Sequence, residues 1–258
     1  VSSGAPLEAS PGASVLAPPF RLVSLDQIDS TNDEAKRLAR QGAGHGTVIR
    51  AREQTAGRGR RGRSWLSPPG NLHISLLLDP GVPLSQAAQL GFVASAALAE
   101  AVARLVPDAL VQSKWPNDVW CQNRKIAGML LEPAEVDRLV VLGIGVNVAH
   151  APTGAPPLYD STCLKDLGCE ADAGMVLSAF LEAFAPLFTL WQAEGFAPIR
   201  SAWGTRARGL GGPITVRLER ETLVGNFGGL DDDGALMLEL GLGQRRRIVA
   251  GDVFFPQP

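Results

Sequence analysis

Cysteine, histidine and aromatic residues are scarce in this 258-residue sequence, which has three cysteines, three histidines and a single tyrosine. The cysteines are odd in number and form no Cys-x-x-Cys pair, which argues against a disulfide framework or a zinc knuckle. A chain without disulfides fits a reducing compartment, so the predicted location is the cytoplasm. The histidines lie at no metal-ligand spacing, and we predict no metal-binding residues.

The sequence also lacks an excess of charge of one sign and a long hydrophobic run. The formal net charge is −2, so the protein as a whole is not built to coat nucleic acid or anionic lipid. The most apolar helical segment, "GFVASAALAEAVARLV", is interrupted by Glu100 and Arg104, from which we predict no membrane span. The N-terminus has no basic region followed by an apolar core, so no signal peptide is expected.

The apolar content of 45% is ordinary for a globular protein. By composition and by the pattern of apolar residues, the sequence divides into three parts. Residues 1–19 are rich in Pro, Ala, Ser and Gly and are predicted to form a disordered tail. Residues 20–210 alternate strand and helix patterns, which predicts an α/β body. Residues 211–258 carry short strands at close spacing, which predicts a small all-β barrel or sandwich.

Local patterns in the α/β part give specific expectations. In "STNDEAKRLARQG", Thr31 and Glu34 have the spacing of a capping box, and Gly42 lies where a helix C-terminal glycine belongs. Residues 84–106 and 173–194 are predicted to be long helices. "NLHISLLLD" predicts a partly alternating strand, and "LVQSKWPNDVWC" predicts one strand whose proline indicates an edge or a bend. "KIAGMLLEP" and "DRLVVLGIGVNV" predict a hairpin pair.

The segment "AGRGRRGRSW", residues 56–65, holds four arginines and three glycines within seven consecutive positions. Glycine lets a backbone approach a ligand closely, and arginine presents planar forks of donors to phosphate or carboxylate. Such a loop has too little apolar surface to offset its ordering entropy, so we expect it to be mobile until an anion binds. By itself the loop is as typical of a solvated linker or a nonspecific RNA-binding tract as it is of an anion site. Its place within a sheet, and Trp65 as a flat face for a nucleobase, favour a nucleotide site.

Three further segments carry candidate groups. "KWPND", residues 114–118, combines a cation suited to neutralising developing negative charge with an amide and a carboxylate that can bind a purine, a ribose or a metal-held phosphate. By itself it is more typical of a structural turn. Lys125 in "KIAG" begins a strand whose small residues leave room for a ligand. "GIGVNV" has alternating glycines in a buried strand, which alone indicates close strand packing more often than a site.

In this order, "GRGRRGRSW", "KWPND", "KIAG" with Glu132 beyond it, and "GIGVN" together resemble the biotin–protein ligases (biotin–[acetyl-CoA-carboxylase] ligases) over about residues 20–258. The resemblance implies an α/β catalytic domain with a mixed sheet, related to class II aminoacyl-tRNA synthetases, followed by a small SH3-like β-barrel. It implies an enzyme that uses ATP and Mg²⁺ to convert biotin to biotinyl-5′-AMP, with release of pyrophosphate. The biotinyl group then passes to one lysine of a biotin carboxyl carrier domain of acetyl-CoA carboxylase or a related carboxylase.

The resemblance also implies roles for individual residues, assigned where this sequence matches the motifs of the family. The positions matched to biotin contacts are Ser30, Thr31, Asn32, Gln54, Gly57, Arg58, Gly59, Arg60, Lys125, Gly128 and Gly143. The positions matched to ATP or adenylate contacts are Arg60, Arg61, Arg63, Trp65, Asn117 and Asn147. The positions matched to catalytic groups are Arg58, Arg60, Lys114, Lys125 and Asp118.

Other interpretations stay open at the level of sequence. A lipoate–protein ligase has a related fold and related adenylate chemistry. A nonenzymatic nucleic-acid-binding protein would use the arginine loop but would leave "KWPND" and "KIAG" without a role. Some bacterial members of the family carry an N-terminal winged helix-turn-helix and repress the biotin operon. The segment before the first strand has no recognition helix here, so we expect ligase activity without DNA binding. Members are often homodimers, and a homodimer is an open expectation.

Overall fold

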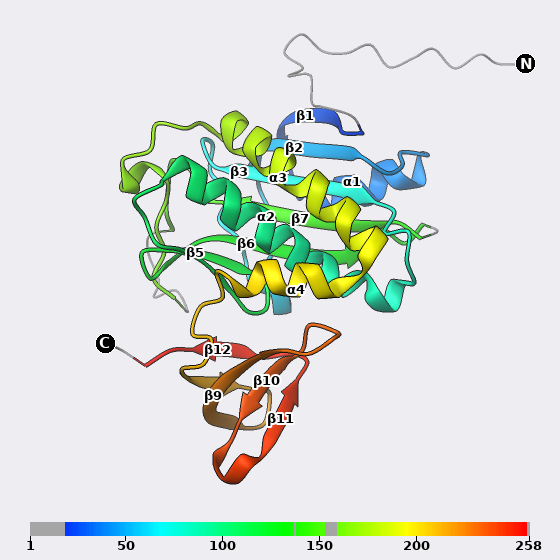
Figure 1. Cartoon of the computed structure of the whole chain (residues 1–258). Coiled ribbons are helices and arrows are strands. Elements are labelled where there is room, and N and C mark those ends of the chain that lie inside the picture. Colours follow the sequence, from blue (N-terminus) through cyan, green and yellow to red (C-terminus); the bar gives the residue numbers. More distant parts are fainter. Residues whose placement is uncertain (1–18, 137, 153–158, 257–258) are drawn as a thin grey trace, which may run out of the picture.

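The computed structural model describes residues 19–136, 138–152 and 159–256, which form two β-sheets and the helices packed on the larger sheet (Figure 1). The disordered tail predicted for residues 1–19 lies, apart from its last position, outside the described residues.

The larger sheet has seven strands in the order β1-β2-β3-β7-β6-β5-β4. Their bounds are β1 Arg21–Ile28, β2 Thr47–Gln54, β3 Leu72–Leu78, β4 Val111–Lys114, β5 Asp118–Cys121, β6 Arg124–Pro133 and β7 Val140–Val146. Strands β1 and β2 are parallel, and the other neighbouring pairs are antiparallel. The mixed sheet and the hairpin of β6 with β7 are therefore confirmed.

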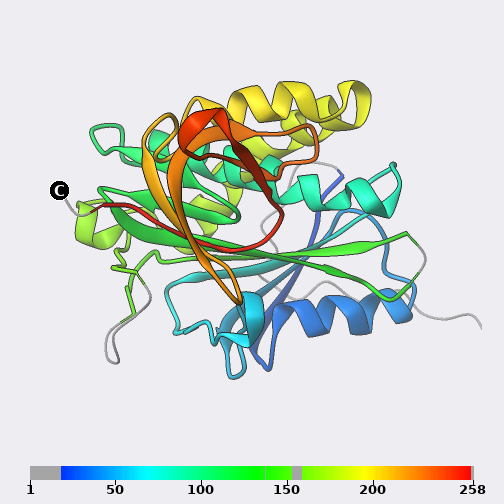
Figure 2. The ribbon, with the colours of Figure 1, turned by 90° about the horizontal axis from the view of Figure 1, so that it is seen from below.

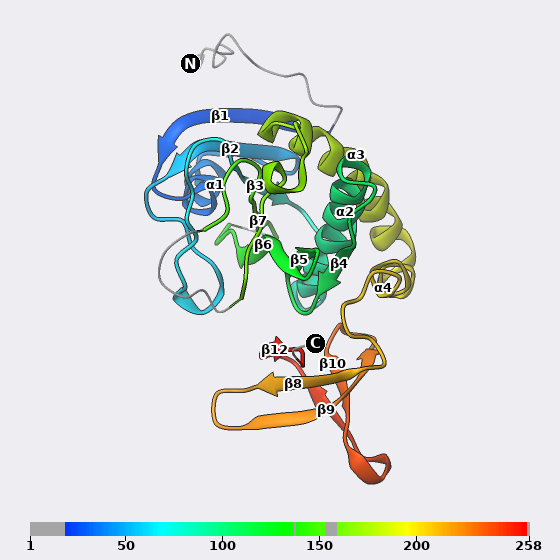
Figure 3. The same ribbon diagram turned by 90° about the vertical axis from the view of Figure 1, so that its left-hand side faces the viewer.

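Helices cover both faces of this sheet. Helix α1, Thr31–Arg40, packs on β2, β3 and β7 from one side, and α2, Leu90–Leu105, and α3, Ala173–Glu194, lie on the other side (Figure 3). Because both faces are covered, every residue of β3 and β7 is buried. The partly alternating pattern predicted for β3 is wrong, since Ser75 and His73 face the protein interior and not solvent.

The predicted long helix at residues 84–106 is divided into a 3-10 helix, Leu84–Gln89, and α2. Gln89 at the junction is buried, and its Oε1 accepts a hydrogen bond of 2.9 Å from Trp191 Nε1 on α3. The other predicted long helix is confirmed as α3. A further helix, α4 at Phe196–Gly204, was not expected from the sequence.

Two helical stretches, Leu84–Leu105 and Ala173–Glu194, are long and apolar enough to span a membrane by length and composition. The sequence had predicted no membrane span. In their most apolar windows, 67% and 44% of the residues are buried inside the protein. Helices α2 and α3 also pack against each other and against the sheet. This packing is that of core helices, so the match is weak support for a membrane span.

The segment "LVQSKWPNDVWC" forms a hairpin and not the single strand predicted. Strand β4 pairs antiparallel with β5, and Lys114 lies opposite Asp118. Trp115, Pro116 and Asn117 make the connection, with a cis peptide bond before the proline. Proline has no N–H to donate to a ladder, which explains why it lies in the turn. The hairpin brings the first and last residues of "KWPND" side by side.

Helix α1 begins at Thr31 with Ser30 as its N-cap residue, and neither Ser30 nor Thr31 caps it through a side chain. The Thr31 hydroxyl donates to Gln54 Oε1 at 3.0 Å, and Glu34 pairs with Arg37. The predicted capping box is therefore wrong, because stronger partners occupy both side chains. The C-terminal glycine is confirmed, since Gly42 has a φ of 94° and donates its N–H to Ala39 O.

The second sheet has five antiparallel strands in the order β11-β10-β9-β8-β12. Their bounds are β8 Pro213–Arg217, β9 Thr222–Leu230, β10 Leu236–Glu239, β11 Arg245–Ile248 and β12 Asp252–Phe254. This sheet lies below the larger one, in front of it when seen from below (Figures 1 and 2). The buried Trp115 donates from Nε1 to Gly234 O at 3.1 Å, which ties the β4–β5 hairpin to the second sheet. The boundary between the parts at residue 210 stays a prediction.

Candidate active site

A cavity of about 400 Å³ opens where the start of α1, the arginine loop, strands β5 to β7 and strand β12 meet. Most of the predicted site residues line it. They are Ser30, Thr31, Asn32, Gln54, Arg58, Gly59, Arg60, Arg63, Trp65, Lys114, Asn117, Asp118, Lys125, Gly128 and Gly143. The fold thus brings together four motifs that lie far apart in the sequence.

Three predicted residues do not line the cavity. A Cβ at Gly57 would lie 2.5 Å from Trp65 O, so this glycine allows close packing within the loop. The Arg61 guanidinium points to Asp252 of β12 instead. Asn147 is buried, and its Nδ2 donates to Thr162 O at 3.0 Å. These three residues therefore lie outside the lining of the cavity, their ligand contacts stay predictions, and Asn147 fastens a neighbouring segment.

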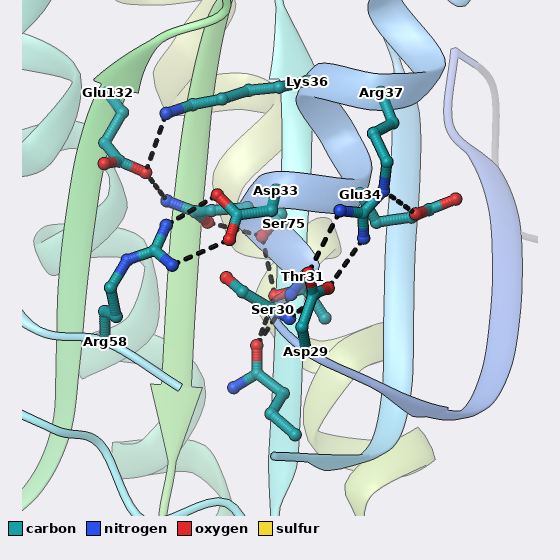
Figure 4. A network of polar contacts seen from close by, with 12 residues as sticks. Asp29, Ser30, Thr31, Asp33, Glu34, Lys36, Arg37, Arg58, Ser75 and Glu132 are labelled. Carbon is teal, nitrogen blue, oxygen red and sulfur yellow. Dashed lines mark hydrogen bonds and ion pairs between the residues drawn. The ribbon is translucent and has the colours of Figure 1, made fainter. Parts of the chain in front are cut away.

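At one end of the cavity, uncharged polar side chains form a chain of hydrogen bonds (Figure 4). Gln54 Oε1 accepts from Thr31 N at 2.8 Å and from the Thr31 hydroxyl at 3.0 Å. Gln54 Nε2 donates to Ser67 Oγ at 2.8 Å. These bonds fix which way the Gln54 amide faces, because its oxygen is bound to α1 and its nitrogen to the loop after Trp65.

The chain of bonds continues through Ser75 and Asn32 to Glu132, and Figure 4 labels Ser75 and Glu132. Ser75 Oγ lies 2.8 Å from Thr31 Oγ1 and 2.6 Å from Asn32 Oδ1, and Asn32 Nδ2 donates to Glu132 Oε2 at 2.8 Å. A Cβ at Gly143 would lie 2.2 Å from Asn32 Oδ1. Gly143 is therefore required for Asn32 to lie against the sheet.

The arginine loop, Gly57–Arg63, has a defined conformation with a 3-10 turn at Arg60–Gly62. Arg58 makes a two-pronged ion pair with Asp33, at 2.7 and 2.6 Å, which holds the pKa of this carboxyl below its usual range (Figure 4). Arg61 and Arg63 both bind Asp252, at 2.9 and 2.8 Å. The mobility predicted for the free loop stays a prediction.

Arg60 is the loop arginine that has no carboxylate partner within the described part of the chain. Its Nη1 donates to Asn117 Oδ1 at 3.2 Å. Burial lowers its pKa from the ordinary value, the neighbouring Arg61 acts in the same direction, and Asp118 opposes both. Arginine stays protonated under such shifts, so Arg60 presents a largely desolvated positive charge to the cavity.

Lys114, Asp118 and Lys125 form the other charged group in the cavity. Lys125 Nζ lies 2.6 Å from Asp118 Oδ1, and Lys114 Nζ lies 3.9 Å from Asp118 Oδ2. The Lys114 side chain is only 2% exposed. Burial lowers the pKa of Lys114 to about 8, with Asp118 opposing that shift. Two cations and one carboxylate leave this end of the cavity positive.

The Trp65 ring lies against two glycines of the sheet. A Cβ at Gly145 would lie 2.4 Å from two atoms of the ring, and a Cβ at Gly128 would lie 3.3 Å from a third. Lys125 Nζ lies 5.5 Å from the ring centroid. Trp65 Nε1 is buried without a hydrogen-bond partner among the described residues. The alternating glycines of "GIGVNV" thus make room for Asn32 and Trp65.

Several residues around the cavity were missed by sequence reasoning. Those that line it are Ser64, Leu66, Ile74, Pro116, Met129, Leu130, Ile144, Gly145, Pro152, Tyr159, Ser161 and Asp252. The alternating glycines were a signal for Gly145, since only one of them was assigned. No pattern in the neighbouring sequence indicates that Ser75, Tyr159 or Asp252 belongs to the site, because strand pairing and the position of the second sheet bring them there.

The sequence profile of the biotin/lipoate A/B protein ligase family matches residues 24–148. The profile of the biotin protein ligase C-terminal domain matches residues 209–255. A biotin–[acetyl-CoA-carboxylase] ligase of Paracoccus denitrificans is 44% identical over 239 residues, which are 90% of this chain and 99% of the relative. The chain belongs to the biotin protein ligase family.

Other members of the biotin protein ligase family extend the match. A bifunctional ligase/repressor of Bacillus subtilis is 36% identical over 90% of this chain and 73% of its own length. The biotin protein ligase of Aquifex aeolicus, solved in complex with biotin and ATP, superposes with a TM-score of 0.78 at 28% identity. That match covers 90% of this chain and 97% of the solved chain, so it includes both sheets.

Proposed function

We propose that this chain activates biotin with ATP to biotinyl-5′-AMP and transfers the biotinyl group to a lysine of a biotin carboxyl carrier domain. The observation that carries this proposal is a single cavity with an uncharged polar end and a cationic end. An acyl-adenylating enzyme needs both, because a neutral ring system must be recognised beside two anions that react.

The uncharged end suits the ureido ring of biotin, which has two donors and one acceptor. Thr31, Asn32 and Gln54 offer amide and hydroxyl groups whose orientations are fixed by their hydrogen bonds. A buried site built from such groups discriminates strongly, because a ligand that lacks the matching partners leaves them unpaired. We propose these three residues, with Ser30, as the groups that recognise the ring.

The cationic end suits the attack of the biotin carboxylate on the α-phosphate of ATP. Two anions meet there, and negative charge grows on the phosphate oxygens and on the leaving pyrophosphate. Arg60, Lys114 and Lys125 provide positive charge in a partly closed cavity, where such contacts are worth most. We propose these three as the main charge-stabilising groups, with Arg58 and Asp118 orienting their neighbours.

The nucleotide contacts are proposed on the same basis. Trp65 lines the cavity with an aromatic ring that can stack on adenine, and Asn117 lies beside Arg60. Arg63 lines the cavity while it is bound to Asp252. Bound phosphate would compete with Asp252 for this guanidinium.

The donor set does not form a protein cage for Mg²⁺. Within the described residues there is no group of three or more His, Cys, Asp or Glu that could hold a metal ion. The cavity carboxylates Asp118 and Asp252 are both engaged in ion pairs. Mg²⁺ commonly keeps most of its ligands from water and substrate phosphates. We therefore assign Mg²⁺ to the ATP phosphates and no protein residue to Mg²⁺.

The carrier partner is proposed from the Paracoccus relative, whose name specifies acetyl-CoA carboxylase. A cytoplasmic location, a homodimer and the lack of operator binding stay predictions.

The function is tested by incubating the protein with biotin, ATP, Mg²⁺ and a biotin carboxyl carrier domain. We expect pyrophosphate release and a carrier heavier by one biotinyl group in the intact mass spectrum. Lipoate in place of biotin serves as the matched control and should give neither signal. Pyrophosphate release with lipoate alone would place the chain in the lipoate branch, and no release with either acid would refute the adenylation proposal.

A further inference from the structure

The ring of Tyr159, the single tyrosine of the chain, lies between Lys114 and the second sheet. Its centroid is 4.1 Å from Lys114 Nζ, and its hydroxyl donates to Val253 O of β12 at 3.2 Å. Tyr159 lines the cavity, yet no sequence motif includes it. Burial raises the pKa of its hydroxyl, so the side chain stays neutral and remains a donor at working pH.

Lys114 is poorly neutralised by charge alone. Its carboxylate partner Asp118 is 3.9 Å away, whereas Lys125 binds that carboxylate at 2.6 Å. No hydrogen bond from Lys114 Nζ is found among the described residues. A buried ammonium without a close counter-charge is costly, and the face of an aromatic ring is a compensating partner. The Tyr159 ring supplies the nearer face, and the Trp120 ring lies farther off, with its centroid 5.7 Å from the same nitrogen.

Tyr159 is itself held from several sides. Its ring centroid lies 5.4 Å from that of Trp120 in an edge-on arrangement and 5.5 Å from that of Phe254. Phe254 belongs to β12, as does the Val253 carbonyl that accepts from the Tyr159 hydroxyl. The ring is therefore fixed by one strand of each sheet.

The backbone after Tyr159 is bound to the start of β6. Lys125 N donates to Asp160 O at 2.8 Å, and Thr162 N donates to Lys125 O at 2.9 Å. Asn147 Nδ2 donates to the Thr162 carbonyl, which explains the buried position of Asn147 away from the cavity. The segment carrying Tyr159 is thus fastened beside Lys125.

We propose that Tyr159 is a positioning residue that holds the Lys114 ammonium at the reacting end of the cavity and links it to strand β12. The proposal rests on the proposed function, because Lys114 is assigned to stabilise the charge that develops during adenylation. The second sheet then supports the chemistry through Tyr159, in addition to the contacts of Asp252 with the arginine loop.

The pH dependence of activity gives a readout that a purely structural role would not move. The charged groups that act on Lys114 are Asp118 on β5, Lys125 on β6, Asp252 on β12 and Arg208 ahead of β8. Burial is the largest influence and lowers the pKa of Lys114 to about 8. Activity that needs the ammonium therefore declines as pH rises through this value.

Two variants separate the ring from the hydroxyl. Tyr159→Phe keeps the ring face and removes the bond to Val253 O, whereas Tyr159→Leu removes both. Without the ring the ammonium loses a favourable partner, so in Tyr159→Leu we expect the alkaline limb of kcat for pyrophosphate release to move to lower pH by about one pH unit. We expect Tyr159→Phe to keep the limb and to lose about threefold in kcat, as for one neutral hydrogen bond. The KM for biotin should stay within about twofold in both.

Lysine NMR reports Lys114 directly and independently of catalysis. The chain has four lysines, Lys36, Lys114, Lys125 and Lys165, so their ε-carbon signals can be assigned from single Lys→Arg variants. We expect the Lys114 titration to move to lower pH in Tyr159→Leu and to be kept in Tyr159→Phe. If Tyr159→Leu fails to fold by circular dichroism, Tyr159→Met replaces it as a ringless variant.

The outcomes distinguish this proposal from the proposed function. A wild-type chain that releases no pyrophosphate refutes the function, whereas the lysine titration still tests the coupling. An unshifted Lys114 titration in the ringless variants overturns the positioning role even if activity falls. A Tyr159→Phe variant with wild-type kcat overturns the link to β12.

Discussion

Replacing Gly143 by alanine should show that the polar end of the cavity depends on one close approach between a strand and a helix. Gly143 lies on β7 opposite Ser75, and α1 brings Asn32 over the same point. The new Cβ would lie 2.2 Å from Asn32 Oδ1 and 2.9 Å from Asn32 Cγ, closer than real atoms come. Asn32 must therefore rotate away or the strand must shift.

The loss of folding free energy in Gly143→Ala follows from the hydrogen bonds that Asn32 would lose. The bond to the Glu132 carboxylate is worth about 2 kcal/mol and the bond with Ser75 about 1 kcal/mol, which together give roughly 3 kcal/mol. In a protein of this size that corresponds to a fall in Tm of about 6–12 °C. Displacing Asn32 also alters the biotin end of the cavity, so the KM for biotin should rise about tenfold.

A double-mutant cycle with Asn32→Ala isolates the cause. If the clash is with the Asn32 side chain, Gly143→Ala should cost most of its roughly 3 kcal/mol in the wild type and little in the Asn32→Ala background. Gly91→Ala is the matched control, because a Cβ at Gly91 meets nothing within 4 Å. Thermal unfolding and the KM for biotin are measured for each variant. Equal effects of Gly143→Ala in both backgrounds would refute the reasoning.

Three further predictions concern charged groups. Asp252→Asn removes the carboxylate that binds Arg61 and Arg63. Because both arginine side chains are 42% exposed, the stability lost by the loop is discounted to about 1 kcal/mol. Trypsin should then cleave the ligand-free loop about fivefold faster, and an unchanged cleavage rate would contradict this. The pKa of Lys114 falls from its ordinary 10.5 to about 8 in the folded chain, so the unfolded chain binds more protons between these values and the free energy of unfolding should rise with pH there. Urea titrations should show a smaller rise in Lys114→Met, and equal slopes would exclude Lys114 as the source. Arg60→Gly removes the desolvated cation of the loop, so adenylate should still form, although more slowly, and should escape and label bystander lysines. Mass spectrometry that finds adenylation without such labelling would speak against shielding by the loop.

The sequence predicted those helices, strands and turns that depend on residues close together in the chain. The hairpin of β6 and β7, the helix α3 and the glycine at the end of α1 follow from periodicity and turn residues. The four motifs also indicated the family, since together they are specific. Local patterns predict secondary structure because the interactions that produce it act between residues a few positions apart.

The sequence misled where a side chain had a better partner elsewhere. The Thr31 hydroxyl binds Gln54 and does not cap its own helix. Strand β3 lost its expected alternation because helices cover both faces of the sheet. In each case a contact distant in sequence outweighed a local preference.

The sequence by itself determined which chemical groups this protein has: an arginine loop, two separated lysines and a set of hydroxyls and amides. Only the tertiary structure decided which of them face one cavity, that Arg61 and Asn147 do not, and that Tyr159 and Asp252 join the site. The physical reason is that a binding site depends on distances of a few ångströms between segments that only the pairing of strands and the packing of the two sheets bring together.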